Sequence, residues 1–416
     1  MLKPTTKETI EEILNLNFYK PKEPLSFKKE YRSLLKRTYN KDLDGYVPDE
    51  LSNITNIYNT IKILIADYKE VVVFAIDGIS YKNFVEAGLK YAPNSSVIGA
   101  LSSVFPSTTG SAWPSILTGT PPSEHGIYGT SFLLEKYNEN YIWISGTLNH
   151  KGTRKYVGDQ PIRLSLTNKS TIFEYANKCG VKSHYIGTHG TGENNHFRKL
   201  LTRGASHHEA IIQDYAKIKR LPNEFVDYFT EATTKYLDIK SNKKKLIWNY
   251  IDLDDFLHEH GYGALEKTNF WQKLFSYWSS NKNNERIFVF ISDHGQVEQS
   301  RFGYSILKVA ESNEDLEYNT GGAGRVLYFY PKPGKNKKIE SWVNDIIRDT
   351  GRVYRKNDLI KKYHLFSKNP CGFERVGEIV AIGKTKNFPA VGCSEYIQEH
   401  GALQEEEMFV PILILG

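Results

Sequence analysis

The sequence has few cysteines and no long apolar stretch, and each of these absences excludes a class of protein. Among 416 residues there are three cysteines, Cys179, Cys371 and Cys393, an odd number with no CxxC spacing. We therefore expect neither a disulfide framework nor a metal site built from thiolates. No segment approaches ~18 consecutive apolar residues, which argues against a membrane-spanning helix, and no membrane partner is expected.

The N-terminus and the charge distribution also lack features that would indicate particular partners. The first residues contain no apolar core of about 7–15 residues, so a secretory signal is not predicted and a cytoplasmic location is expected. The net charge of +6 is modest for this length, and the basic runs at residues 243–245 and 335–338 are short. Specific nucleic-acid binding is not expected, because it would require a concentrated basic face, whereas a small anionic substrate is compatible with this charge.

Apolar runs alternate with helical patterns along most of the chain. Strands are predicted at residues 71–76, 246–251, 287–292, 325–330, 378–382 and 409–415. Helix-like spacing of apolar residues occurs at residues 6–16, 51–68, 270–278 and 339–347. This alternation predicts an α/β fold with a doubly wound, mostly parallel sheet and helices on both faces.

The same patterns predict one catalytic domain preceded by a helical segment. We expect residues 1–69 to form helices that pack on a core of residues 70–416. Residues of about 130–243 and 300–395 carry no metal-type motif at strand ends, so both stretches are predicted to be insertions into the core. No internal repeat of about 20–50 residues is present.

Two acidic motifs directly follow predicted strands. Asp77 follows the run VVVFAI, and the pair Asp293 and His294 follows IFVFIS. Ligands converge at the carboxyl ends of parallel strands in α/β sheets, and carboxylate oxygens combined with imidazoles suit Zn²⁺ or a similar divalent ion. An aspartate at a strand end can also be a plain turn residue, and for Asp77 taken alone this alternative stays open.

A third motif places an aspartate and a histidine four residues apart, in Asp254-x-x-x-His258. On a helical turn this spacing puts both side chains on one face, where they can share a metal ion. Three neighbours compete for the same role: Asp252, Asp255 and His260. His400, near the C-terminus, is a weak signal by itself. The motifs together predict a metallohydrolase.

A threonine-rich turn lies between the first two predicted strand regions. Residues 105–119, FPSTTGSAWPSILTG, are predicted to form a loop that leads into a short helix. Pro114 is compatible with the first turn of a helix, so the helix should begin between residues 110 and 113. A hydroxyl at that start would lie beside unpaired backbone N–H groups, which favour a phosphate. Thr108 and Thr109 are equally suited to be N-caps.

Taken together, these motifs resemble the alkaline phosphatase superfamily, specifically its type I phosphodiesterase/nucleotide pyrophosphatase branch. The resemblance runs from about residue 70 to residue 416 and does not cover the N-terminal segment. It rests on the strand-Asp-Gly, the FPSTT…LTG…P…HGI…G stretch, the D-x-x-x-H-x-x-G, the SDHG and the terminal HGAL…EEMFVPIL. The resemblance implies an alkaline-phosphatase-like core with insertions.

The resemblance also implies a set of site residues and a reaction. Thr109 would be the nucleophile, and two divalent metal ions, with Zn²⁺ expected, would be the cofactors. One ion would be bound by Asp254, His258 and His400, and the other by Asp77, Asp293, His294 and the Thr109 oxygen. The implied reaction cleaves a phosphodiester or pyrophosphate bond of a small, nucleotide-like substrate through a covalent threonine intermediate.

The sequence departs from the family pattern just after the predicted nucleophile. Nucleotide pyrophosphatases typically carry an asparagine there that holds a phosphoryl oxygen, and Ala112 is the expected vacated position. The substitute donor would be a helix N–H group, Ser111, or one of three basic residues: Lys151, Arg154 and Lys155. Two alternatives stay open, a phosphomonoesterase on the same scaffold and a non-catalytic module that binds a phosphorylated ligand through metal ions.

Overall fold

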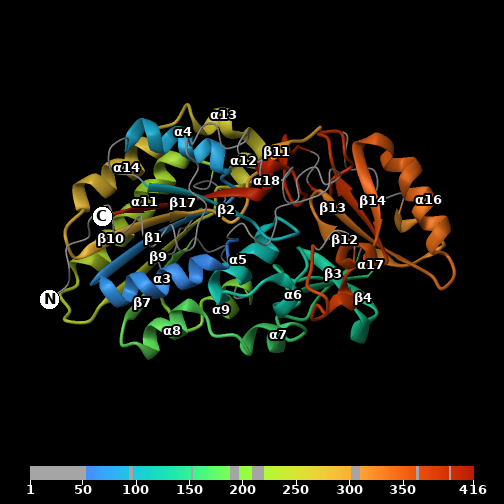
Figure 1. The fold of residues 1–416 in the computed structure, drawn as a ribbon, viewed down its shortest axis with the longest axis horizontal. Helices are drawn as coiled ribbons and strands as arrows, with labels where there is room; N and C mark the ends of the chain where they lie inside the picture. Colours follow the sequence, from blue (N-terminus) through green and yellow to red (C-terminus); the bar gives the residue numbers. More distant parts are fainter. Residues whose placement is uncertain are drawn as a thin grey trace.

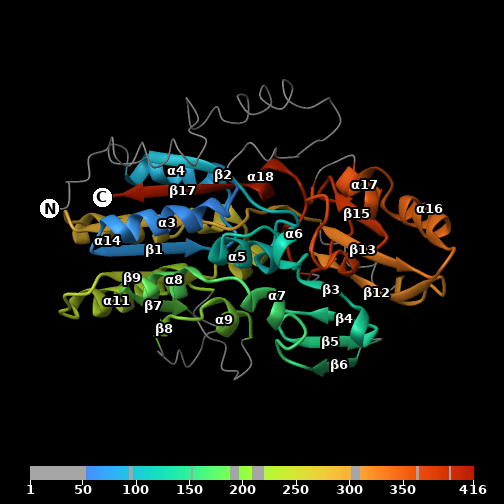
Figure 2. The same cartoon turned by 60° about the horizontal axis from the view of Figure 1, so that its bottom comes forward.

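The computed structural model describes residues 53–92, 97–150, 153–187, 196–208, 220–300, 310–361, 365–392 and 395–416. The helix predicted at residues 6–16, and most of the predicted N-terminal segment 1–69, lie outside these ranges. The described part of the chain forms two large β-sheets, one of seven strands and one of eight. Figure 2 shows the eight-stranded sheet at one end of an elongated molecule and the seven-stranded sheet at the other.

The seven-stranded sheet has the strand order β2-β17-β10-β1-β9-β7-β8. Its parallel strands are β1 (Glu70–Ile76), β7 (Lys182–Gly187), β8 (Ser206–His207), β9 (Lys245–Ile251) and β10 (Arg286–Ile291). The antiparallel strand β17 (Phe409–Leu415) lies between β10 and the edge strand β2 (Val97–Ser102). The prediction of a mostly parallel sheet is confirmed.

Both faces of this sheet are covered by helices, as predicted (Figure 1). One face carries α4 (Tyr81–Tyr91), α11 (Pro222–Asp238) and α14 (Phe270–Asn281). The other face carries α3 (Asn56–Asp67), α5 (Thr109–Thr118) and α8 (Ile172–Lys178). Shorter helices are α6 (Pro122–His125), α7 (Arg163–Thr167), α9 (His196–Leu201), α12 (Asp254–His260), α13 (Tyr262–Leu265), α17 (Lys356–Lys361) and α18 (Glu405–Met408).

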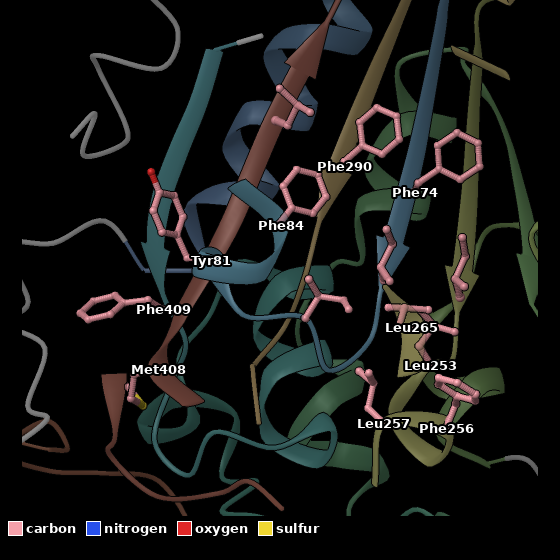
Figure 3. Packing of buried hydrophobic residues seen from close by; sticks show 14 of the residues in the cluster. Phe74, Tyr81, Phe84, Leu253, Phe256, Leu257, Leu265, Phe290, Met408 and Phe409 are labelled. Atoms are coloured by element: carbon pink, nitrogen blue, oxygen red, sulfur yellow. The ribbon is translucent and has the colours of Figure 1, made fainter. Parts of the chain in front are cut away.

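The central strand β1 explains why the sheet is covered on both faces. All of its residues are buried, and because side chains alternate along a strand, neighbouring residues join different apolar clusters. Phe74 belongs to the cluster beneath α4, where its ring lies 5.4 Å from that of Phe290 (Figure 3). Val73 faces the cluster beneath α3 and α5. The continuous apolar run therefore marks a strand that is buried from both sides.

The eight-stranded sheet is antiparallel and has the order β14-β15-β13-β12-β3-β4-β5-β6. Four of its strands lie close together in the sequence: β3 (Ser131–Leu134), β4 (Glu139–Ile142), β5 (Thr147–His150) and β6 (Thr153–Tyr156). The other four come later in the chain: β12 (Leu316–Ala323), β13 (Val326–Pro331), β14 (Gly351–Arg355) and β15 (Ile379–Gly383). The helix α16 (Asn336–Ile347) packs on β13, β14 and β15.

The structure modifies the expected insertions in two ways. The two stretches do not form separate insertions, because their strands join in one sheet through the pairing of β12 with β3. The range 130–243 is too wide, since it contains β7, β8, α8 and α11, which belong to the seven-stranded sheet and its faces. The strands predicted at residues 325–330 and 378–382 are β13 and β15 of the second sheet. An apolar run indicates burial but not the sheet to which a strand belongs.

None of the described helices combines the length and the apolar character that crossing a membrane would require.

Candidate metal centre

Three adjacent parallel strands bring the predicted site residues to one edge of the seven-stranded sheet. The register pairs Ile76 at the end of β1 with Ile251 at the end of β9, while Ala75 pairs with Ile291 of β10. The chain therefore leaves all three strands at the same level, and the aspartates that follow them meet there. His400 reaches this edge from the loop after the short strand β16 (Gln398–Glu399).

The first group of ligand-type side chains consists of Asp77, Asp293 and His294, which are all fully buried. One ligand atom from each lies within 4.8 Å of the others. The Nε2 atom of His294 lies 3.3 Å from Asp77 Oδ1 and 3.2 Å from Asp293 Oδ2. The backbone N–H of Gly78 donates to Asp293 Oδ1 at 3.3 Å, while Oδ2 makes no hydrogen bond. This oxygen is a buried acceptor that is turned toward the group.

Thr109 lies against this group, and Thr108 does not. The Thr109 Oγ1 atom is 3.1 Å from His294 Nε2 and 3.3 and 3.4 Å from the two Asp77 oxygens. The Thr108 hydroxyl points elsewhere, to the hydroxyl of Thr130 at 3.3 Å, and makes no capping bond to the helix. Between the two threonines, Thr109 is therefore the one placed for chemistry at the group.

The helix that carries Thr109 begins earlier than predicted. It starts at Thr109, so Pro114 lies inside it and not in its first turn. A proline at this position removes one backbone bond, the one to the Gly110 carbonyl. The helix is buried over almost its whole length, and its packing between neighbouring elements outweighs that loss. The prediction of a start between residues 110 and 113 was wrong for this reason.

The second group consists of Asp254, His258 and His400. Asp254 Oδ2 lies 3.2 Å from His258 Nε2 and 3.4 Å from His400 Nε2. In each histidine the other ring nitrogen faces a backbone carbonyl, that of Gln398 at 2.7 Å and that of Ser107 at 3.1 Å. Nδ1 of each ring is therefore the protonated donor, which leaves the two Nε2 atoms available as metal ligands.

The alternatives to Asp254 and His258 are not brought together in the same way. Among the residues that the structure describes, the groups of three or more metal-type side chains include neither Asp252, Asp255 nor His260. His260 is exposed and its ring lies 4.9 Å from that of Phe256. The spacing of four residues on α12, and not the local abundance of acids and histidines, accounts for the difference.

The two groups adjoin each other. The rings of His294 and His400 are stacked with their centroids 3.9 Å apart, and ligand atoms of Asp254, His294 and His400 lie within 4.8 Å of one another. All seven side chains predicted as metal ligands or nucleophile therefore lie in one continuous cluster. Such an arrangement offers carboxylates and imidazoles that could hold a divalent metal ion.

The carboxylates of the first group have raised pKa values, because they are buried close to other negative charges. Burial, reinforced by the charge of Asp254, raises the pKa of Asp77 to about 6. Burial, with the charges of Asp77 and Asp254, holds the pKa of Asp293 well above its ordinary range. The buried carboxylates of Asp77 and Asp293 lie near each other and near the charge of Asp254, which disfavours their ionisation, and a bound cation would relieve this repulsion.

In the second group, neighbouring opposite charges outweigh burial and favour the ionised forms of the side chains. Burial disfavours the charge of Asp254, but the adjoining imidazoles of His258 and His400 bring its pKa well below the ordinary value. Burial likewise opposes protonation of His258, yet the charges of Asp254 and Glu399 raise the pKa of this imidazole to about 10. Protons on the imidazoles thus occupy the place that a metal ion would take, since both bind to the same Nε2 atoms.

The residues fit a divalent ion. The donors are imidazole nitrogens and carboxylate oxygens, a set that Zn²⁺ accepts. Asp293 Oδ2 makes no hydrogen bond, and the Nε2 atoms of His258 and His400 face Asp254 Oδ2 inside the cluster. The cluster thus satisfies the two requirements of a metal site, ligand atoms of the correct kind and ring orientations fixed by outer hydrogen bonds.

Comparison with known proteins decides the family. The sequence profile of the type I phosphodiesterase/nucleotide pyrophosphatase family matches residues 71–401. The chain belongs to this family. The predicted family is confirmed, and with it the prediction of a phosphodiesterase-like hydrolase. No curated protein sequence matches this phosphodiesterase family member.

Solved structures show the fold of this family member. The structural match to phosphonoacetate hydrolase from Sinorhizobium meliloti 1021, in complex with phosphonoformate, spans 83% of this chain and 89% of the hydrolase chain. The two chains are 16% identical and the TM-score is 0.56. Murine ectonucleotide pyrophosphatase/phosphodiesterase 5 covers 82% and 87%, with 16% identity and a TM-score of 0.56. The predicted alkaline-phosphatase-like fold is confirmed by these likenesses.

Three residues of this phosphodiesterase family member support the cluster and were missed by sequence reasoning. Tyr250 Oη donates to Asp77 Oδ2 at 2.5 Å, and Trp113 Nε1 donates to the same oxygen at 3.0 Å. The Gln296 amide donates to Asp254 Oδ1, which turns Oδ2 toward the histidines. Trp113 had a detectable signal, because it lies four residues after Thr109 on the same helix face. Tyr250 and Gln296 had none.

The structure contradicts the expectation that Ala112 stands where the family has its phosphate-binding asparagine. Ala112 is fully buried in the apolar cluster beneath α5, so an asparagine there would bury an amide in the core. The interpretation of this position as a vacated phosphate donor was wrong. Arg154 is exposed on β6, at the outer edge of the second sheet, as is Lys155, and Lys151 lies outside the described residues. The hydroxyl of Thr130 lies 3.3 Å from that of Thr108 in the threonine turn.

Proposed function

We propose that this chain is a two-metal phosphodiesterase that cleaves a phosphodiester or pyrophosphate bond of a small, nucleotide-like substrate through a covalent threonine intermediate. The observation that carries this proposal is the position of the Thr109 hydroxyl, 3.1 Å from His294 Nε2 and 3.3 Å from Asp77 Oδ1. A threonine at this place has no packing role that requires its hydroxyl. Its oxygen is an additional ligand atom and a nucleophile.

The roles of the side chains follow from the two groups. Asp77, Asp293 and His294 would hold one ion with the Thr109 oxygen, and Asp254, His258 and His400 would hold the other. Two Zn²⁺ ions bound there would lower the pKa of the threonine hydroxyl and offset the charge of the phosphoryl group.

Thr109 also begins α5, and the positive end of this helix favours a bound phosphoryl group. The Thr109 hydroxyl would lose its proton and its oxygen would attack phosphorus while the bond to the leaving oxygen breaks, and the leaving oxygen would take up a proton. Water would then hydrolyse the covalent phosphothreonine or nucleotidyl-threonine and restore the Thr109 hydroxyl. Thr130, whose hydroxyl lies 3.3 Å from that of Thr108, is suited to donate to a phosphoryl oxygen in place of an asparagine amide.

The substrate class is supported by the family and by the ligands of its relatives. An inactive form of murine ectonucleotide pyrophosphatase/phosphodiesterase 5 was solved in complex with AMP, and the structure covers 83% of this chain with a TM-score of 0.57. The phosphonoacetate hydrolase was solved with phosphonoacetate and with phosphonoformate. Small phosphorylated molecules are therefore the class of ligand that we assign to this site.

Metal analysis tests the first half of the proposal. Purified protein should contain roughly two divalent ions per chain, mostly zinc. Asp293→Ala should lose roughly one of them, whereas Asp345→Ala, which removes an exposed aspartate of α16, should lose none. A wild-type protein without divalent metal, and without activation by added Zn²⁺ or Mn²⁺, would contradict the two-metal site.

Substrate comparison tests the second half. One preparation of known metal content should be assayed with p-nitrophenyl phosphate, bis-p-nitrophenyl phosphate and a nucleotide pyrophosphate. We expect the diester and the pyrophosphate to be the better substrates. A preference for the monoester of more than about tenfold in kcat/KM, or ~1.4 kcal/mol, would replace the diesterase by a phosphomonoesterase and leave the metal site unchanged.

A further inference from the structure

A buried carboxylate outside the predicted ligand set faces the second group of metal ligands. Glu399 is 3% exposed and is the residue before His400. Its Oε1 atom lies 3.7 Å from His400 Nε2 and 4.0 Å from His258 Nε2. Within the described ranges, these two imidazoles are the cationic side chains within 4.0 Å of the Glu399 carboxylate. A buried carboxylate that has no lysine or arginine beside it among the described residues requires another source of positive charge.

The orientation of the two rings places Glu399 on the coordinating side. A supporting carboxylate normally accepts the N–H of the ring nitrogen that does not bind the metal. Here those nitrogens already have partners, since Nδ1 of His258 donates to the Gln398 carbonyl and Nδ1 of His400 to the Ser107 carbonyl. Glu399 Oε1 faces the Nε2 atoms instead. One ligand atom each from His258, Glu399 and His400 lies within 4.8 Å of the others.

Two glycines make room for this carboxylate. A Cβ atom on Gly324 would lie 2.6 Å from Glu399 Oε1, and one on Gly392 would lie 2.4 Å from Oε2. Both distances are far below van der Waals contact. The backbone N–H of His400 donates to Oε1 at 3.0 Å, which fixes the carboxylate from a third direction. The chain therefore encloses the Glu399 side chain in a fixed position beside the histidines.

We propose that Glu399 is a further ligand of the ion held by Asp254, His258 and His400, an inference that rests on the proposed metal centre. The site then combines two imidazoles with two carboxylates. A second carboxylate adds negative charge and a hard oxygen donor, which favours hard divalent ions such as Mn²⁺ more than a site with one carboxylate does. Glu399 thus sets both the affinity and the metal preference of this half of the centre.

The variant Glu399→Gln tests the proposal with little change in shape. Glutamine keeps the volume of the side chain and an oxygen that accepts from His400 N–H, but it removes the charge. Binding of Zn²⁺ and Mn²⁺ should be measured by competition with chelators, and Co²⁺ binding by its visible absorption spectrum. We expect one of the two ions to bind at least about tenfold more weakly, with the larger loss for Mn²⁺, and the Co²⁺ spectrum to change.

A matched control and a second variant separate the role of the ligand from that of the fold. Glu298→Gln makes the same charge change in β11 (Val297–Glu298), the strand that pairs with β16, at an exposed side chain, and should bind both ions as the wild type does. Gly392→Ala keeps the carboxylate but displaces it, and the φ of Gly392 is not positive, so alanine suits the backbone. It should reproduce the metal-binding loss of Glu399→Gln.

A third variant, Asp254→Ala, distinguishes failure of this inference from failure of the metal centre. If Asp254→Ala loses one ion while Glu399→Gln and Gly392→Ala keep wild-type affinities and the wild-type Co²⁺ spectrum, Glu399 is not a ligand and the centre stands. If Asp254→Ala also retains both ions, the centre itself is wrong, and Glu399 has no ion to bind.

Discussion

Tyr250 offers a sensitive test of how the chain tunes its first metal ligand. Its hydroxyl donates to Asp77 Oδ2 at 2.5 Å, and the Trp113 indole donates to the same oxygen at 3.0 Å. The other oxygen, Oδ1, faces Thr109 and His294. The two donors therefore determine which oxygen of Asp77 is presented to an ion. Tyr250→Phe removes one of them and keeps the aromatic ring that packs on Trp113.

The expected size of the effect follows from this geometry. A hydrogen bond to a charged group contributes about 1.5–3 kcal/mol, which corresponds to about 10- to 150-fold in affinity. Because Trp113 continues to donate, we expect the lower part of this range, about 10- to 30-fold weaker binding of the ion at Asp77, Asp293 and His294.

The loss should also depend on pH. Burial raises the pKa of Asp77 to about 6, and the bond from Tyr250 opposes that rise. Without the bond, the pKa of Asp77 rises further. An ion must displace the proton from this carboxylate, so more of the affinity is lost at pH 6 than at pH 8, and the midpoint for metal binding moves to higher pH.

The assay is a zinc titration in chelator-buffered solutions at pH 6, 7 and 8, with Tyr250→Phe compared with the wild type. Tyr330→Phe is the matched control, because its buried hydroxyl bonds to backbone groups in the second sheet, donating to Arg375 O and accepting from Leu133 N. It should leave zinc binding unchanged. Equal zinc affinities for Tyr250→Phe and the wild type at all three pH values would refute the tuning of Asp77 by Tyr250.

Three further predictions concern the nucleophile and the stability of the fold. Thr109→Ala should lower turnover by several orders of magnitude and Thr108→Ala far less, as measured by initial rates on a diester; the reverse order would show that the wrong threonine was assigned. His125 is fully buried, and burial lowers its pKa to about 3, so the stability it contributes is present above pH 6.5 and is lost as pH falls toward 3. By pH 5 the loss in the free energy of unfolding is about 2 kcal/mol. When unfolding is followed in urea, the free energy of unfolding of His125→Gln should therefore fall less between pH 7 and pH 5 than that of the wild type. Equal falls for the two proteins would exclude this role of His125. Arg325 and Glu407 form a fully buried ion pair at 3.1 Å. Arg325→Met should therefore lower the free energy of unfolding by about 3–5 kcal/mol, because it leaves the Glu407 carboxylate buried without its partner. A loss below ~1 kcal/mol would show that burial of the unpaired carboxylate is compensated in another way.

The sequence by itself determined the α/β class, the strands that form the centre of the sheet and the positions of the acidic motifs after them. These features are local: a continuous apolar run indicates a strand buried on both faces, and a polar residue directly after it marks the strand end. Adjacent parallel strands end at one edge, so the convergence of Asp77 and Asp293 could be expected from the chain alone. The spacing of Asp254 and His258 on a helix was equally readable.

Only the tertiary structure decided which side chains face the same point. The choice between Thr108 and Thr109 depends on where α5 begins, and the structure places that start at Thr109, in a helix that is buried over residues 110–118. The sheet to which β13 and β15 belong depends on pairing across long stretches of sequence, which an apolar run does not encode. Tyr250 meets the cluster through strand register, and Glu399 fits beside it because the distant Gly324 and the nearer Gly392 leave room for its carboxylate. Contacts of this kind arise from packing between remote segments, so no local pattern predicts them.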